Sequence, residues 1–200
     1  MSVSSKTAGQ NIDKESHNGV SRREFVAGAT AAAVIGTAGG TSALAKDAVS
    51  ARNQELIYMP ASVQLDLFRA RQLSPVEVLE AQIARHESAN SKVNCTTYTF
   101  FDKARKEAKE SEARWMRGTA RPLEGITCAL KDEHHEAGMK VTLGSIMEKD
   151  NVKNYTDPLT VKLKAAGCVT HMQMTVPEFY LHGLTFTRLW GCLLYTSPSP

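Results

Sequence analysis

Two short apolar runs separated by a helical pattern constrain the fold of this chain more than any other feature. The runs cover residues 126–130 and 168–172, and residues 158–166 between them carry apolar side chains at helical spacing. This strand–helix–strand order favours a layered α/β fold with some parallel strand pairing. The first run ends at Lys131 and Asp132, so these side chains are expected at the carboxyl edge of a sheet, where ligands usually bind.

Local signals predict helices before the first apolar run. Ser74 is suited to cap a helix, Pro75 to occupy its first position and Glu77 to complete a capping box. Residues 102–116 carry acidic and basic side chains at i,i+4 spacing, which indicates a solvated helix that Gly118 could end. A shorter amphipathic helix is expected just before Ser74.

The first 45 residues have the order of an export signal and are set apart from the fold. A polar stretch leads to Ser-Arg-Arg-Glu-Phe around Arg22 and Arg23, followed by an uncharged run that ends in Ala-Leu-Ala. This pattern resembles a twin-arginine signal, so we expect recognition by the twin-arginine export machinery, cleavage and a periplasmic or secreted protein without stable membrane insertion. An uncleaved anchor is the alternative, although Gly, Thr and Ser make residues 25–45 a poor span. Residues 46–61 are expected to form a linker.

Charge and cysteine content argue against several classes of partner and cofactor. The chain has 24 Lys and Arg against 21 Asp and Glu, a net charge of +3 with both signs interspersed, so no nucleic-acid partner is expected. Its four cysteines form no C-x-x-C pair and have no histidine at zinc-finger spacing. Cys95, Cys128, Cys168 and Cys192 are therefore interpreted as small apolar residues rather than as a metal knuckle or a disulfide scaffold.

Several motifs, taken in order, resemble the amidase signature family. Leu-Glu-Gly-Ile-Thr-Cys-Ala-Leu-Lys-Asp at residues 123–132 is similar to that family's L-x-G-[IV]-P-x-x-[VL]-K-D strand. Residues 137–145 match its A-G-x-x-x-T-x-G-S segment, and residues 157–167 match its following helix. Thr-Val-Pro-Glu-Phe at 175–179 is similar to its T-x-x-P-E-F. The resemblance indicates that residues 62–191 are the amino-terminal part of an amidase domain.

The resemblance implies an α/β/α layered fold around a mixed sheet, with only its amino-terminal part present. It also implies hydrolysis of a small-molecule carboxamide through a Ser-cisSer-Lys triad, in which Lys131 matches the lysine. A lysine that accepts a proton must be uncharged, so burial of this side chain is expected. The attacking serine forms an acyl-enzyme that water hydrolyses, and no metal or other cofactor is required. Without the resemblance, Lys131 would be interpreted as an ordinary surface lysine.

Other polar residues offer site roles that compete with structural ones. His134 and His135 lie among carboxylates, but they lack H-E-x-x-H spacing, so a polar loop is expected rather than a metal site. His171 and His182 stand beside apolar residues and are interpreted as packing histidines. Ser145 matches a family position, yet a serine at this point equally suits a turn.

Departures from the family pattern restrict the expected activity. Thr127 stands where proline is usual, and the sequence lacks the family's Gly-Gly-Ser-Ser-Gly-Gly region, which carries the middle serine, and the later nucleophile. Residues 192–200 resemble a translated sequencing adapter, so we expect a truncated amidase that is inactive as written. The alternatives are an amidotransferase A-type subunit that supplies ammonia to an aminoacyl-tRNA, which export disfavours, and an exported binding domain without enzymatic activity.

Overall fold

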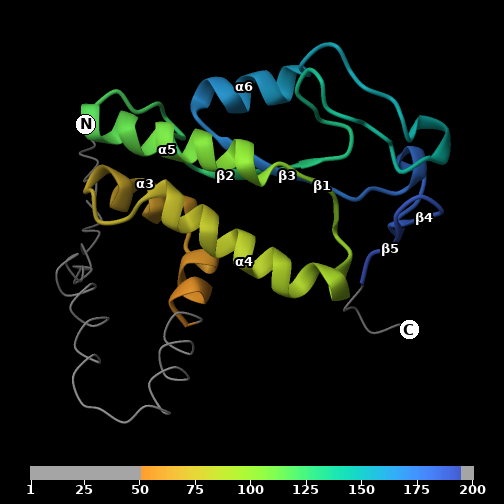
Figure 1. Cartoon of the computed structure of the whole chain (residues 1–200), viewed down its shortest axis with the longest axis horizontal. Coiled ribbons are helices and arrows are strands. Elements are labelled where there is room, and N and C mark those ends of the chain that lie inside the picture. Colours follow the sequence, from red (N-terminus) through yellow and green to blue (C-terminus); the bar gives the residue numbers. More distant parts are fainter. Residues whose placement is uncertain (1–50, 195–200) are drawn as a thin grey trace, which may run out of the picture. The chain divides into compact units, whose positions relative to one another are not determined.

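The computed structural model describes residues 51–194 of the chain (Figure 1). The chain divides into two units, Met1–Ile35 and Gly36–Pro200, and every described residue belongs to the second. The expected export signal and the last six residues of the expected tail lie outside the described residues. Within the described part, no helix is long and apolar enough to cross a membrane.

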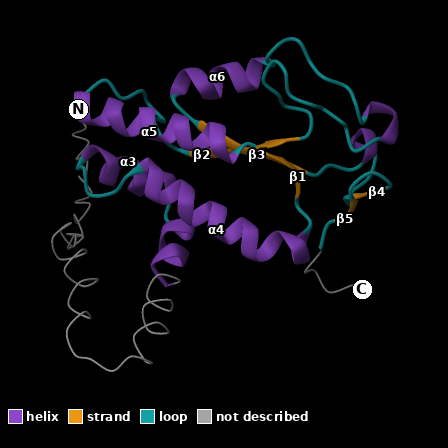
Figure 2. Ribbon diagram, in the orientation of Figure 1, coloured by secondary structure: helices purple, strands orange, loops and turns teal. Residues whose placement is uncertain are grey.

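A mixed three-stranded sheet forms the centre of the second unit (Figure 2). Its strands are β1 (Thr96–Thr99), β2 (Thr127–Lys131) and β3 (Val169–Met174), in the order β1-β3-β2. β2 runs parallel to β3, and β1 runs antiparallel to it. The two predicted strands and their parallel pairing are therefore confirmed, whereas β1 was not predicted.

Two long helices cover the sheet, and their predicted signals operate as expected. α4 (Pro75–Val93) begins at a complete capping box, in which Ser74 Oγ accepts from a backbone N–H and the Glu77 carboxylate accepts from Ser74 N at 2.9 Å. α5 (Phe101–Arg117) ends at Gly118, which has a left-handed conformation with φ of 72°. The two helices lie alongside each other in Figure 1, and small α5 side chains allow α4 to pack closely. Their shared core with β3 consists of Leu79, Ile83, Ala104, Ala108 and Val169.

The segment expected to be a linker instead contributes to the core. Residues 51–58 are helical, and the buried Leu56 packs in one cluster with Phe68 of α3 (Ala61–Arg69). The linker prediction over residues 46–61 is therefore corrected for 51–58. Leu56 is joined there by Ile57 and Met59, which are partly buried against the same cluster.

α6 (Pro158–Ala166) connects β2 to β3 and confirms the predicted strand–helix–strand order. Asp157 caps its first turn by accepting from Leu159 N at 2.9 Å. Gly167 ends it with φ of 106°, where a Cβ atom would lie 2.7 Å from the Glu124 Cα atom. This close approach brings the end of α6 against the segment that leads into β2.

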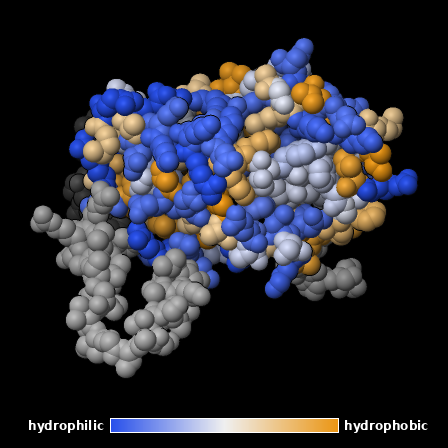
Figure 3. Space-filling view, in the orientation of Figure 1, coloured by the Kyte–Doolittle hydropathy of each residue, from blue (hydrophilic) through white to orange (hydrophobic). Residues whose placement is uncertain are grey.

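Irregular structure follows β3 and ends in a second, two-stranded sheet. The short 3-10 helix η2 (Glu178–Tyr180) precedes β4 (Phe186–Thr187) and β5 (Gly191–Cys192), whereas another, η1 (Ile146–Glu148), lies earlier, between β2 and α6. Cys192, the first residue of the expected foreign tail, pairs with Phe186 in this sheet. Figure 3 shows apolar side chains gathered near β4 at one end of the visible face. The exposed apolar residues in these segments include Met147, Leu181, Leu184 and Phe186.

Candidate functional site

Lys131 lies at the carboxyl end of β2, opposite Met174 of β3, as predicted. Its side chain is 47% exposed, and its Nζ atom lies 2.8 Å from Glu133 Oε1. The same nitrogen lies over the ring of Tyr180, 4.3 Å from the ring centroid. The expected burial is therefore not found. β2 is an edge strand of the sheet, so a side chain at its end reaches solvent and meets a carboxylate there.

Asp132, directly after Lys131, is fully buried and joins the strand end to a distant loop. Its Oδ1 atom accepts hydrogen bonds from Thr142 N at 2.9 Å and from Gln173 Nε2 at 3.1 Å. Its Oδ2 atom accepts from the Thr142 hydroxyl. Burial raises the pKa of Asp132 above 3.8, and the hydrogen bonds from Thr142 and Gly144 offset only part of this effect. The K-D motif contains this carboxyl, but nothing in the motif predicted its burial.

The Thr142 hydroxyl extends this buried network. It accepts a hydrogen bond from Trp190 Nε1 at 2.9 Å and donates to Asp132. Gly144 follows with φ of 68°, and a Cβ atom there would lie 2.8 Å from the Val176 carbonyl oxygen. The T-x-G-S motif is the signal that could have located this contact, since its glycine permits close approach of another backbone segment.

Ser145 is buried and caps a helix in this structure. Its Oγ atom accepts from Met147 N at 3.2 Å, which starts η1. Of the two interpretations of this serine, the structure therefore supports the local structural role. Its hydrogen bond does not lead to Lys131.

The adjacent histidines lie in the loop after β2 and attach it to α6. His135 is buried, and its backbone N–H donates to Asp157 Oδ2 at 2.7 Å. The His134 ring faces the other carboxylate oxygen of Asp157 at 3.4 Å. Burial acts to raise the pKa of Asp157, but hydrogen bonds from Thr160 and from His135 N lower it to about 2. Within residues 51–194, no three His, Cys, Asp or Glu side chains are grouped so that they could hold a metal ion.

The other two candidate histidines differ from each other. His171 is buried, and its Nδ1 atom lies 3.1 Å from the Cys128 carbonyl oxygen. Burial lowers the pKa of His171 to about 4, so the ring packs in its neutral form. His182 is exposed, and its interpretation as a packing residue is wrong. The apolar neighbours that suggested packing, Leu181 and Leu184, are themselves exposed.

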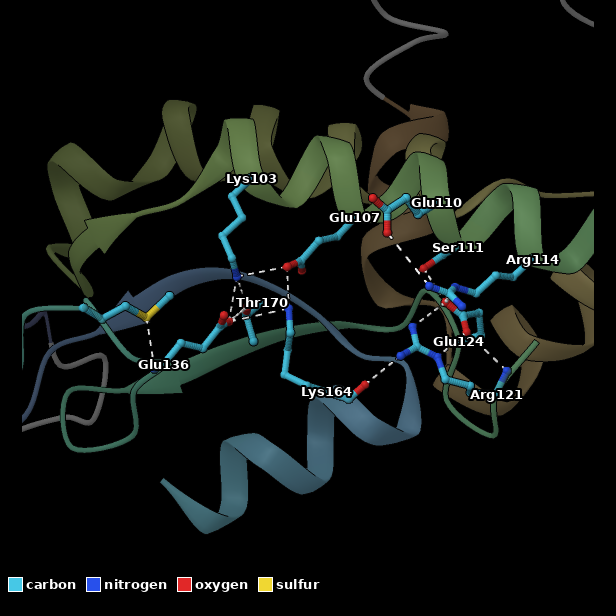
Figure 4. Close-up of polar contacts among 11 residues, drawn as sticks. Lys103, Glu107, Glu110, Ser111, Arg114, Arg121, Glu124, Glu136, Lys164 and Thr170 are labelled. Atoms are coloured by element: carbon cyan, nitrogen blue, oxygen red, sulfur yellow. Dashed lines mark hydrogen bonds and ion pairs between the residues drawn. The ribbon is translucent and has the colours of Figure 1, made fainter. Parts of the chain in front are cut away.

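Four alternating charges tie the loop after β2 to α5 and α6 (Figure 4). Lys103 Nζ lies 2.7 Å from Glu136 Oε1 and 3.0 Å from Glu107 Oε1. Lys164 of α6 pairs with Glu107 and lies 3.6 Å from Glu136. Burial acts to raise the pKa of Glu136, but hydrogen bonds from Lys103 and Thr170 hold it below its ordinary value. The network restrains the loop that follows Lys131.

A second charged cluster fixes the amino end of β2 (Figure 4). Glu124 is fully buried and accepts from Arg121 Nε at 2.6 Å, from another Arg121 nitrogen at 2.9 Å and from Ser111 Oγ at 2.7 Å. Arg114 Nε lies 3.8 Å from the same carboxylate. Burial acts to raise the pKa of Glu124, but the bonds from Arg121 and Ser111 outweigh it and keep the carboxylate charged.

Comparison with known families identifies the chain. The family model described as Amidase matches residues 77–191, which is more than half of the 200 residues. The chain belongs to the amidase signature family. An amidase of Gibberella zeae is 32% identical over 125 residues, and the A-type subunit of glutamyl-tRNA(Gln) amidotransferase from Chelativorans sp. is 31% identical over 121 residues.

These similarities concern part of each relative. The two alignments cover 61% and 60% of this chain, but 23% and 24% of the relatives. The chain thus spans about a quarter of the length of these curated relatives. A bacterial aryl acylamidase of the amidase signature family aligns with a TM-score of 0.64 and 26% identity, over 68% of this chain and 29% of that enzyme. Fatty acid amide hydrolase aligns with a TM-score of 0.67 over 86% of this chain and 33% of its own, a likeness of fold at 22% identity.

Proposed function

We propose that the native protein hydrolyses a carboxamide and that Lys131 is the lysine of its Ser-cisSer-Lys triad. The observation that carries the proposal is the position of Lys131 at the carboxyl end of a strand that pairs in parallel with β3. Family membership supports it, because the matched segment includes this strand. The adjoining Asp132 is buried and fixes the strand end by its hydrogen bonds, while the lysine nitrogen remains accessible.

In the proposed reaction, Lys131 transfers a proton through the middle serine to and from the nucleophilic serine. The nucleophile forms an acyl-enzyme, the amine leaves, and water releases the carboxylic acid. Both serines lie in family segments that the 200 residues do not match. The proposed activity therefore concerns the native protein, and the 200 residues by themselves are proposed to be inactive.

Accessibility of Lys131 requires a further step before proton transfer. As a free lysine is protonated at neutral pH, an uncharged amine has to form in the working site. In this structure the Lys131 nitrogen lies 2.8 Å from the Glu133 carboxylate. We propose that the substrate or further protein covers Lys131 in the working site.

The test is hydrolysis of a panel of aliphatic amides and anilides by the native protein. Lys131→Ala should lower the rate about 10²–10⁴-fold, because a positioned proton-transfer group contributes on this scale. Lys131→Arg should fare no better, since a guanidinium stays protonated. Lys140→Ala is the matched control, because Lys140 is another half-exposed lysine paired with a carboxylate, Asp150 at 3.3 Å. Substantial activity in either Lys131 variant contradicts the proposed role.

A second candidate is an amidotransferase A-type subunit, which the similarity to the Chelativorans protein favours. Ammonia release from glutamine, accompanied by transfer to an aminoacyl-tRNA in the presence of partner subunits, would distinguish it from a simple amidase. If the native protein hydrolyses none of the amides, the alternative of an exported binding domain is favoured instead.

We also propose that the native protein is exported by the twin-arginine pathway to the periplasm or cell exterior. Support comes from the sequence around Arg22 and Arg23, since these residues lie outside the described part of the structure. Replacing both with lysine keeps the charge but removes the guanidinium shape, so a reporter fused after Lys46 should stay in the cytoplasm. Lys6→Arg with Lys14→Arg is the matched control and should leave export unchanged. Export of the double-lysine variant at the wild-type level refutes the proposal.

A further inference from the structure

Tyr180 contacts the proposed catalytic lysine at two points. Its ring centroid lies 4.3 Å from Lys131 Nζ, a distance suited to a cation–π interaction. Its hydroxyl donates to the Asp132 carbonyl oxygen at 3.3 Å. One side chain therefore touches both the ammonium group and the backbone from which the lysine projects.

The turn that carries Tyr180 has an unusual backbone. Phe179 and Tyr180 have φ values of 48° and 63°, in the left-handed region that bulky side chains rarely adopt. Such a conformation costs free energy and persists where the surrounding structure imposes it. Here Phe179 N donates to the Leu143 carbonyl oxygen at 2.9 Å, and Gly144 allows the two segments to approach. The loop from the Asp132 network thus holds Tyr180 against Lys131.

We propose that Tyr180 is a positioning residue for Lys131, with its ring setting the place of the lysine nitrogen and its hydroxyl fixing the strand end. This rests on the proposed role of Lys131 in amide hydrolysis. Glu133 attracts the same nitrogen, but its carboxylate also lies 3.7 Å from His134 Nε2 and so does not define one position for the lysine. Burial and the nearby carboxylates raise the pKa of the Tyr180 hydroxyl, which keeps it a neutral donor.

The contact is tested without a substrate by reductive methylation of the lysines in the full chain with isotope-labelled formaldehyde. The ring should shift the methyl proton resonances of dimethylated Lys131 upfield, and Lys131→Arg assigns that signal. We expect the shift in the wild type and in Tyr180→Phe, which keeps the ring, and its loss in Tyr180→Leu. Tyr155→Leu is the matched control, because the Tyr155 ring contacts His135 instead. Equal thermal midpoints for wild type and Tyr180→Leu establish that the variant is folded.

Hydrolysis by the native protein tests the functional consequence. Tyr180→Leu should lower kcat about three- to tenfold with KM unchanged, and Tyr180→Phe should recover most of the loss. An unshifted Lys131 signal in the wild type, or a wild-type kcat in Tyr180→Leu, overturns the inference. Absence of hydrolysis by the wild type contradicts the proposed function instead, and the methyl shift then decides whether Tyr180 positions the lysine.

Discussion

Two buried carboxyl groups flank strand β2, and they are compensated in different ways. Glu124 precedes the strand and Asp132 follows it, and both side chains are fully buried. Glu124 accepts a forked pair of hydrogen bonds from the Arg121 guanidinium, whereas Asp132 accepts from the uncharged groups of Thr142 and Gln173. The pKa of Glu124 is accordingly held below its ordinary value, and burial raises that of Asp132.

The difference distinguishes the two ends of β2. The end near Glu124 anchors the strand, and the end near Asp132 presents Lys131 for the proposed reaction. Arg121 pairs with Glu124 and also donates to the Lys164 carbonyl oxygen at 2.9 Å. The same guanidinium therefore holds α6 against the segment that leads into β2. At the other end, Lys131 is adjacent to Asp132 in sequence but pairs with Glu133 at the surface. Neutral donors satisfy Asp132, and the half-exposed lysine stays accessible for the proposed reaction.

The largest change in the free energy of unfolding should come from removing Arg121, the cation at the anchoring end of β2. Arg121→Met keeps much of the side-chain volume but leaves Glu124 buried without its main partner. Loss of one member of a buried pair typically costs about 3–5 kcal/mol, and we expect about 2–3 kcal/mol because Arg121 is one-third exposed and Arg114 lies nearby. The free energy of unfolding, measured in urea, checks this value.

Arg105→Met provides the matched control for that variant. Arg105 makes the same forked contact with Glu80, at 2.7 and 3.1 Å, but Glu80 is 44% exposed and water replaces the lost partner. Its loss of stability should be a small fraction of that in Arg121→Met. Equal losses in the two variants would show that burial of Glu124 is not what makes the anchoring end strong.

Much of the framework around this comparison was predictable because its signals are local. The capping box at Ser74 and the terminal Gly118 each act within one helical turn, and both operate as predicted. The apolar runs that became β2 and β3 also have a local pattern. β1 was missed because Thr-Thr-Tyr-Thr has no apolar alternation, and its pairing with β3 depends on residues more than 70 positions away.

The site was predictable in its position but not in its surroundings. The motif located Lys131 at the carboxyl end of a strand, and the structure confirms that placement. Its exposure was not foreseen, because it depends on Glu133 and on Tyr180, which lies almost 50 positions further along the chain. The buried environment of Asp132 likewise comes from Thr142 and from a distant glutamine of β3, so no single motif contains it.

The smallest expected effect, and the sharpest test of the comparison, is in how stability depends on pH. The stability difference between wild type and variant should change with pH in opposite directions for Asp132 and Glu124. A carboxyl whose native pKa is raised stabilises the fold fully below its unfolded value and loses that contribution as pH rises through the native value. Asp132 is such a group, so the wild type should gain stability relative to Asp132→Asn as pH falls from about 7 to about 3.

The opposite dependence is expected for Glu124→Gln. A carboxyl whose native pKa is lowered contributes above its unfolded value and loses that contribution as pH falls through the native value. The advantage of the wild type over Glu124→Gln should therefore shrink over the same pH range. Urea unfolding of the three proteins at each pH gives both differences, and effects of acid common to all three cancel. Slopes of the same sign would mean that the native fold shifts the pKa of both carboxyl groups in the same direction, and the contrast between the two ends of β2 would then fail.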